Sequence, residues 1–226
     1  MLQILLEATI DTLRMVFIAS VFTILIGMPL GLLLEATQNK HILGNKYLWL
    51  HKLLRSTINF FSNIPIFLML IMLIPIINKV LFEHFTIELS AVIALIFIGI
   101  FIFANDVFNS LNNLPKELSD TAKFLGARSI QVITKFLLPE AMHHLVQNIT
   151  KLIINLIGLS MVASALGSNG LGRLALEKGY NDLELSYVFY IILLSTSIIY
   201  AIKLLGNYVT NTVFNATTNK NQEHAQ

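Results

Sequence analysis

The sequence predicts an all-α polytopic membrane protein with five transmembrane helices. It is 55% hydrophobic and only 12% charged, whereas soluble domains carry about 25% charged residues. The apolar residues are gathered in stretches long enough to cross about 30 Å of hydrocarbon as helices, at roughly 20 residues each. A strand of a membrane barrel needs only about 10 residues. Helices are therefore the expected spanning elements, because they satisfy their own backbone hydrogen bonds in lipid.

Each predicted span follows from one apolar run. The runs lie near residues 12–34, 58–80, 90–110, 145–167 and 185–207. The first contains Gly27 and Gly31, a pair of small residues at a spacing that permits close packing of helices. The second contains Pro65 and Pro75, and proline removes a backbone hydrogen bond from a helix. We therefore expect the second span to bend or break.

The chain shows no linker that would divide it. Residues 1–214 are therefore expected to form one transmembrane domain. The stretch 215–226, with the sequence NATTNKNQEHAQ, is polar and is expected to form a tail without regular structure.

Basic residues predict how the spans are oriented in the membrane. The loops after the first and third spans hold four Lys or Arg residues each, and those after the second and fourth hold one and two. Cytoplasmic loops carry an excess of Lys and Arg, so the first and third loops are expected in the cytoplasm. With five spans, the N-terminus then lies outside and the C-terminus in the cytoplasm.

The cytoplasmic stretch after the third span is amphipathic, unlike the spans on either side. Leu118, Ala122 and Leu125 fall at i, i+4 and i+7, which places them on one stripe of a helix. Gly126 predicts the end of this helix, because glycine readily adopts the left-handed conformation of a helix C-terminus. A second amphipathic helix is expected to follow, and Pro139 is expected to close it.

This stretch resembles the EAA loop of ABC-importer permeases, whose pattern is Glu-Ala-Ala, three residues, Gly, nine residues and Ile-x-Leu-Pro. The matching positions are Asp120, Thr121, Ala122, Gly126, Leu138 and Pro139. Asp stands for Glu and Thr for the first Ala, while the spacing is intact. The resemblance implies that the loop, near residues 114–141 and including Leu125, is a coupling element that docks on an ATPase subunit.

A wider resemblance runs from about residue 11 to residue 207. The chain is similar to the permeases of methionine ABC importers, with matches that include IGMPLG at 26–31, LLPEA at 137–141 and IGLS at 157–160. The resemblance implies a type I ABC-importer permease fold in a bacterial inner membrane. It also implies a homodimer, two ATPase subunits that bind ATP and Mg²⁺, an extracytoplasmic substrate-binding protein, and L- and D-methionine as substrates.

Five residues are candidates for the substrate pathway. Asn63 and Pro65 lie in the second span, which the family places near the pathway, and Leu159, Ser160 and Val162 lie in the fourth. Their apolar and mildly polar character suits a thioether side chain better than a charged or sugar substrate.

Other classes of function have little support in the sequence. No Gly-Lys dipeptide occurs, which excludes a P-loop. The chain has no Cys, and the adjacent His143 and His144 would point about 100° apart on a helix, unlike a chelating i, i+4 pair. No basic face for nucleic acid is visible. We therefore expect no catalytic residue, metal or cofactor in this chain.

Three alternatives remain open. The chain could be an ABC permease for another amino acid or small solute. A membrane-embedded enzyme would need facing catalytic groups at depth, and no such pair can be assembled. An autonomous channel or carrier would transport without ATP, and it would usually place charged residues deep in several spans.

Overall fold

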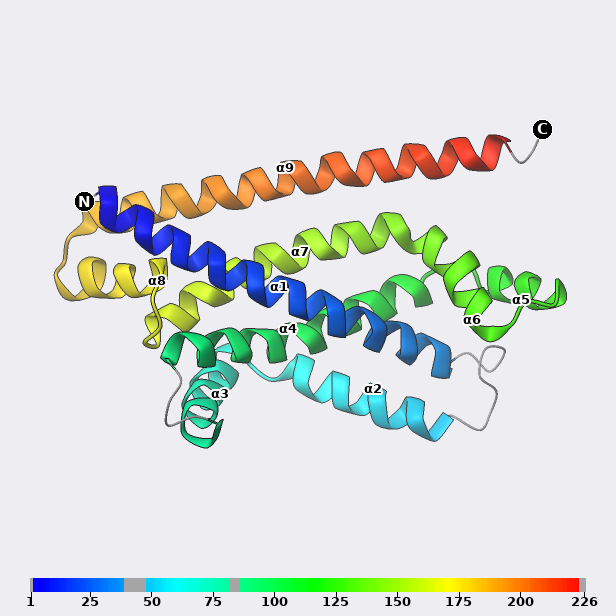
Figure 1. Cartoon of the computed structure of the whole chain (residues 1–226), viewed down its shortest axis with the longest axis horizontal. Helices are drawn as coiled ribbons and strands as arrows, with labels where there is room; N and C mark the ends of the chain where they lie inside the picture. Colours follow the sequence, from blue (N-terminus) through cyan, green and yellow to red (C-terminus); the bar gives the residue numbers. More distant parts are fainter. Residues whose placement is uncertain (1, 39–47, 82–85, 224–226) are drawn as a thin grey trace. The chain divides into compact units, whose positions relative to one another are not determined.

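The computed structural model describes residues 2–38, 48–81 and 86–223, and every regular element in these ranges is a helix (Figure 1). The elements in chain order are α1 (Leu2–Gln38), α2 (Leu48–Asn63), α3 (Ile66–Leu81), α4 (Ile87–Asn112), α5 (Lys116–Phe124), α6 (Ser129–Gln131), the π-helix η2 (Val132–Leu137), α7 (Leu138–Ala165), α8 (Leu171–Leu174), the π-helix η3 (Ala175–Asn181) and α9 (Leu185–Glu223).

The helices confirm four of the five predicted spans, and the predicted span near 58–80 is divided between α2 and α3. In the described part of the chain, four helical stretches are long and apolar enough to cross a membrane: Leu2–Gln38, Ile87–Asn112, Val132–Ala165 and Leu185–Thr212. A fifth arises if α2 and α3 are counted together as one broken span. The break falls at Ile64 and Pro65, as the position of this proline predicts, because its ring nitrogen cannot donate to the helical ladder. Pro75 lies inside α3 without ending it.

The chain folds as two compact units, each assembled from segments of several helices. Unit 1 contains Met1–Ile24, Ile64–Ile100 and Lys151–Lys203, and unit 2 contains Leu25–Asn63, Phe101–Thr150 and Leu204–Gln226.

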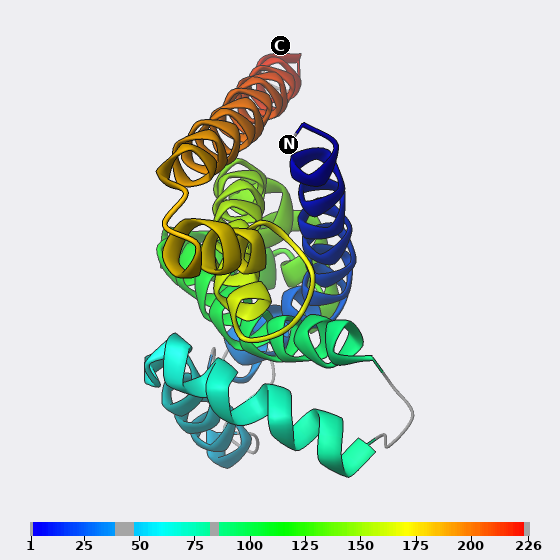
Figure 2. The same cartoon turned by 90° about the vertical axis from the view of Figure 1, so that its left-hand side faces the viewer.

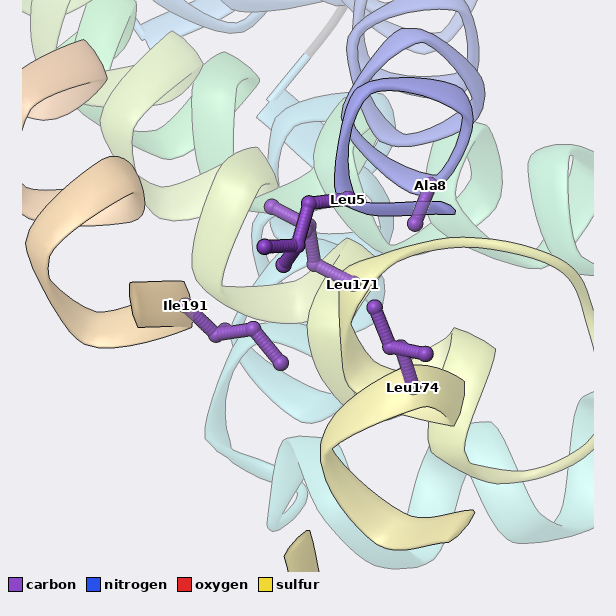
Figure 3. Close-up of a cluster of buried hydrophobic side chains, with 5 residues drawn as sticks. All are labelled: Leu5, Ala8, Leu171, Leu174 and Ile191. Atoms are coloured by element: carbon purple, nitrogen blue, oxygen red, sulfur yellow. The ribbon is translucent and has the colours of Figure 1, made fainter. Parts of the chain in front are cut away.

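One core of unit 1 joins α1, α8 and α9. Figure 3 shows the five buried apolar side chains of this core, which come from segments far apart in the sequence. They are Leu5, Ala8, Leu171, Leu174 and Ile191. Their burial holds the short helix α8 against the start of α1, because removing apolar surface from solvent stabilises the contact.

The start of α8 is also held by hydroxyl groups of two other helices. The backbone N–H of Leu171 donates to Oγ1 of Thr12 in α1 at 2.9 Å. The N–H of Gly172 donates to Oγ of Ser164 in α7 at 3.1 Å. These contacts satisfy amide groups that a helix leaves without internal partners in its first turn. The turn between α7 and α8, yellow in Figure 2, is thereby fixed at its end.

The core of unit 2 places α2 against α1 and α4. Its buried residues are Leu34, Ile58, Ala104 and Phe108. A side chain of α2 adds polar contacts: Nη1 of Arg55 donates to Oδ1 of Asn105 at 3.0 Å, and its guanidinium lies 4.4 Å from the ring centroid of Phe108. Gly31 confirms the predicted close approach, because a Cβ there would lie 2.7 Å from the carbonyl oxygen of Ala104.

Two expectations differ from the structure. Pro139 does not close a helix, because η2 continues directly into α7 at Leu138. The N–H of Leu138 bonds to the carbonyl of Ile133, five residues back, and such a widened π turn accommodates a proline in the following turn.

The polar tail also differs, since α9 continues to Glu223 with no Pro or Gly after Gly206 to stop it. Residues 224–226 lie outside the described part.

Candidate functional site

The candidate coupling element begins with α5, and its end is a specific C-terminal turn. Gly126 has φ +79°, a left-handed conformation that suits glycine. The N–H of Ala127 donates to the carbonyl of Ala122 at 3.0 Å. This six-to-one bond around a left-handed glycine is the Schellman motif. The predicted helix stop at Gly126 is therefore confirmed.

The turn at the end of α5 exposes two large apolar side chains on the surface of unit 2. Phe124 is 91% exposed and Leu125 is 73% exposed, while Ala122 is fully buried. Thr121 is exposed and Asp120 is half-buried. The predicted stripe thus divides at its end, with Ala122 packing inward and Leu125 facing outward. We call Phe124, Leu125 and Ile130, which is 65% exposed, the apolar tip.

The second half of the element is anchored by buried side chains of η2, although Ile130 of α6 is exposed. The side chain of Gln131 accepts a hydrogen bond from the N–H of Arg128 at 2.8 Å, which caps the first turn of α6. In η2 the side chains of Val132, Ile133 and Leu137 are buried, and this segment packs against α5. The segment therefore fixes the position of α5 and its Schellman turn.

The end of the motif lies where η2 becomes α7. Leu138 is half-buried and Pro139 is exposed. Because α6, η2 and α7 follow one another without an interruption from Ser129 to Ala165, the candidate coupling element is continuous with a candidate membrane span.

Sequence reasoning missed part of the apolar tip. Periodicity places Ile130 on the same side as Ile133 and Leu137, but the structure exposes Ile130 and buries the other two. The π-helix changes the angle between successive side chains, so an α-helical period misplaces residues across it. Phe124 carried a usable signal, since it is a large apolar residue beside Leu125 at a predicted helix end.

The pathway candidates have different environments. Asn63 and Pro65 are exposed, and Nδ2 of Asn63 donates to the carbonyl of Asn59 at 2.7 Å. Leu159 and Val162 are half-buried. Ser160 is 1% exposed, and its hydroxyl donates to the carbonyl of Ile157 at 2.8 Å.

Among the described residues, no three His, Asp or Glu side chains lie together in a way that could hold a metal ion. Ion pairs on the surface of unit 1 join residues one helical turn apart. In one of them, Nζ of Lys178 donates to Asp182 at 2.7 Å. This hydrogen bond and the charge of Asp182 raise the pKa of Lys178 above its ordinary value of 10.5.

Comparison with known proteins identifies the family of the chain. Residues 27–214 match the model of the family described as "Binding-protein-dependent transport system inner membrane component". A relative from Pasteurella multocida strain Pm70, named "Probable D-methionine transport system permease protein MetI", is 35% identical over 199 residues, covering 88% of each chain. The "Methionine import system permease protein MetP" of Bacillus subtilis strain 168 is 34% identical over 172 residues, 74% of this chain and 76% of the relative.

A solved structure shows the same architecture over nearly the whole chain. It is a MetNI methionine ABC transporter in an inward facing conformation, and it aligns with a TM-score of 0.86 at 28% identity. The alignment covers 94% of this chain and 97% of the transporter chain. The all-helical spans, the motif around Gly126 and these matches together show that the chain belongs to the family of inner membrane components of binding-protein-dependent transport systems, with the type I ABC-importer permease fold.

Proposed function

We propose that this chain is the permease of an ATP-driven methionine importer. Two copies form the translocation pathway, and each docks on a separate ATPase subunit that binds ATP and Mg²⁺. An extracytoplasmic binding protein delivers L- or D-methionine. The proposal is supported by the family of the chain and by relatives whose names state methionine transport.

The observation that carries the proposal is the apolar tip. Phe124 and Leu125 have most of their surface in solvent, on an element whose second half is anchored. Fully burying such a side chain is worth about 1.5–3 kcal/mol. A soluble partner that covers the tip therefore gains affinity without disturbing the fold of this chain. A cleft in an ATPase subunit is such a partner.

The continuity of α6, η2 and α7 supplies a mechanical link. A movement of the ATPase that displaces the apolar tip also displaces η2, because α5 packs against it. The displacement then acts on the helix that carries Leu159, Ser160 and Val162. The ATPase biases the permease only through contacts that differ between its inward and outward states.

The pathway is proposed to use Asn63 and Pro65 beside the three residues of α7. The helical path is broken at Pro65, between α2 and α3. Broken helices often lie at the substrate sites of transporters. Ser160 is buried in the structure, so it contacts substrate only in a state that uncovers it. We place the N-terminus outside the cell and the C-terminus in the cytoplasm, following the distribution of Lys and Arg.

The test is uptake of radiolabelled methionine into proteoliposomes that contain the chain, its cognate ATPase and its binding protein. Uptake is expected to require ATP. Leu125→Asp is expected to lower both uptake and ATPase binding at least about tenfold, since it places a charge in an apolar contact. Leu125→Met conserves the volume and apolar character, so it is expected to retain both activities. Uptake by the chain alone, independent of nucleotide, would instead identify a channel or carrier.

A permease for another amino acid or small solute is the second candidate. The same proteoliposomes distinguish the two, by competition with excess unlabelled L-methionine, D-methionine and other amino acids. Methionine that fails to compete, while another solute enters with ATP, would keep the permease role and replace its substrate.

A further inference from the structure

Unit 1 contains a cavity that the proposed transport function does not use. Its volume is about 180 Å³, and it lies among the first half of α1, the first turns of α4 and the turn between α7 and α8. None of the coupling or pathway residues lines it. Its size allows a polar head group with several carbon atoms, since about 10–15 Å³ of such space already holds one water.

The lining separates into an apolar floor and a charged rim. Met15 from α1 and Val92 from α4 are buried and form the floor. Asp11 and Arg14 of α1 lie three residues apart on one side of the helix and also line the cavity. Asp11 is half-buried and Arg14 is exposed, so we assign them to the rim. Glu88, at the start of α4, also lines the cavity and is exposed. A ligand that fits this arrangement has a charged end and an apolar end.

The rim is partly organised by hydrogen bonds. Nδ2 of Asn169 donates to Oε1 of Glu88, and Oδ1 of Asn169 accepts from Nη1 of Arg173 at 3.1 Å. Nε of Arg173 donates to Glu177 at 2.7 Å. These contacts hold Asn169 and the carboxylate of Glu88 at the edge of the cavity, so less side-chain entropy is lost when a ligand binds there.

The charges of the rim select the class of ligand. The carboxylates of Asp11 and Glu88 attract an ammonium group and repel a simple anion. The guanidinium of Arg14 offers paired N–H donors to a carboxylate or phosphate, and it disfavours a bare metal cation. We infer that the cavity binds a zwitterion in which an ammonium group and an oxyanion are carried by an apolar body.

Two sources supply this chemistry: the head group of phosphatidylethanolamine, and a free α-amino acid with an apolar side chain. Asp11, Glu88 and Asn169 fall at the ends of the predicted spans near 12–34, 90–110 and 145–167. Either source can reach that level, the lipid from the bilayer and the amino acid from water. The inference rests on the cavity of unit 1 and does not depend on ATP-driven transport.

The experiment uses the full-length chain without other subunits, in two arms. In the lipid arm, the protein is purified from membranes containing phosphatidylethanolamine and phosphatidylglycerol, and native mass spectrometry counts the retained lipids. In the amino-acid arm, the protein is placed in nanodiscs of phosphatidylglycerol alone, which has no ammonium group, and equilibrium dialysis measures the binding of radiolabelled L-methionine.

The wild-type chain is expected to bind at least one of the two probes. Asp11→Asn and Arg14→Gln are each expected to weaken that binding about tenfold or more, because each removes a charge-assisted hydrogen bond. Asp182→Asn is the matched control, since it removes an exposed carboxylate whose partner, Lys178, is outside the cavity lining. It is expected to bind like the wild type.

Selective retention of phosphatidylethanolamine supports a lipid site, and saturable methionine binding supports an amino-acid site. If the wild-type chain binds neither probe, the inference is overturned whatever the variants do. It is also overturned if both variants bind as tightly as the control. Thermal unfolding of each variant shows whether a loss of binding reflects a loss of fold.

Discussion

Gly126 offers the sharpest test of the proposed coupling role of the segment from α5 to η2. Its φ of +79° is unfavourable for an L-residue with a Cβ, by roughly 1–2 kcal/mol. No atom outside its immediate chain neighbours lies within 4 Å of the position that a Cβ would occupy. Within this chain the cost of Gly126→Ala is therefore a backbone cost alone, because the new methyl group meets no neighbouring side chain.

This backbone cost predicts the size of the effect on docking. If the strain displaces the Schellman turn, the apolar tip occupies its docking geometry less often, and the apparent Kd rises in proportion. A cost of about 1–2 kcal/mol corresponds to a rise of about 5-fold to 30-fold. The assay is equilibrium binding of the cognate ATPase subunit to the immobilised permease.

Gly126→Asn provides the matched comparison. Asparagine has a larger side chain than alanine but adopts the left-handed conformation more readily. It is therefore expected to lose less affinity than Gly126→Ala. If asparagine loses more affinity than alanine, side-chain size and not backbone conformation controls the contact, and the reasoning is refuted.

The remaining predictions concern stability. A Cβ on Gly172 would collide with the carbonyl oxygen of Met161, so Gly172→Ala is expected to destabilise the fold by about 1–3 kcal/mol, measured by thermal unfolding. Gly158→Ala, which has open space, is the control and should not destabilise. Arg55→Met removes the contacts of this side chain with Oδ1 of Asn105 and with the ring of Phe108. It is expected to lower the free energy of unfolding by about 1–2 kcal/mol. The exposed Lys52→Met should melt like the wild type, and equal melting of both variants would contradict the role of Arg55.

The sequence was sufficient for features that depend on local chemistry. The apolar runs predict the spans because each run is long enough by itself to cross the hydrocarbon. The break at Pro65 and the turn at Gly126 follow from the backbone properties of proline and glycine. The helical period also identified the stripe that contains Ala122 and Leu125.

The direction that each residue of the stripe faces was decided by tertiary structure. Ala122 is buried and Leu125 is exposed, although both are apolar and belong to one stripe. The helical period cannot distinguish them, because the difference depends on the segments that pack against α5, η2 among them. Likewise, proline at position 139 would ordinarily be expected to end a helix, because it lacks a backbone N–H. The π-helix η2 widens the preceding turn, and the helix continues through Pro139. The cavity between Arg14 and Glu88 has the same origin, since only folding brings charges more than seventy residues apart to one rim.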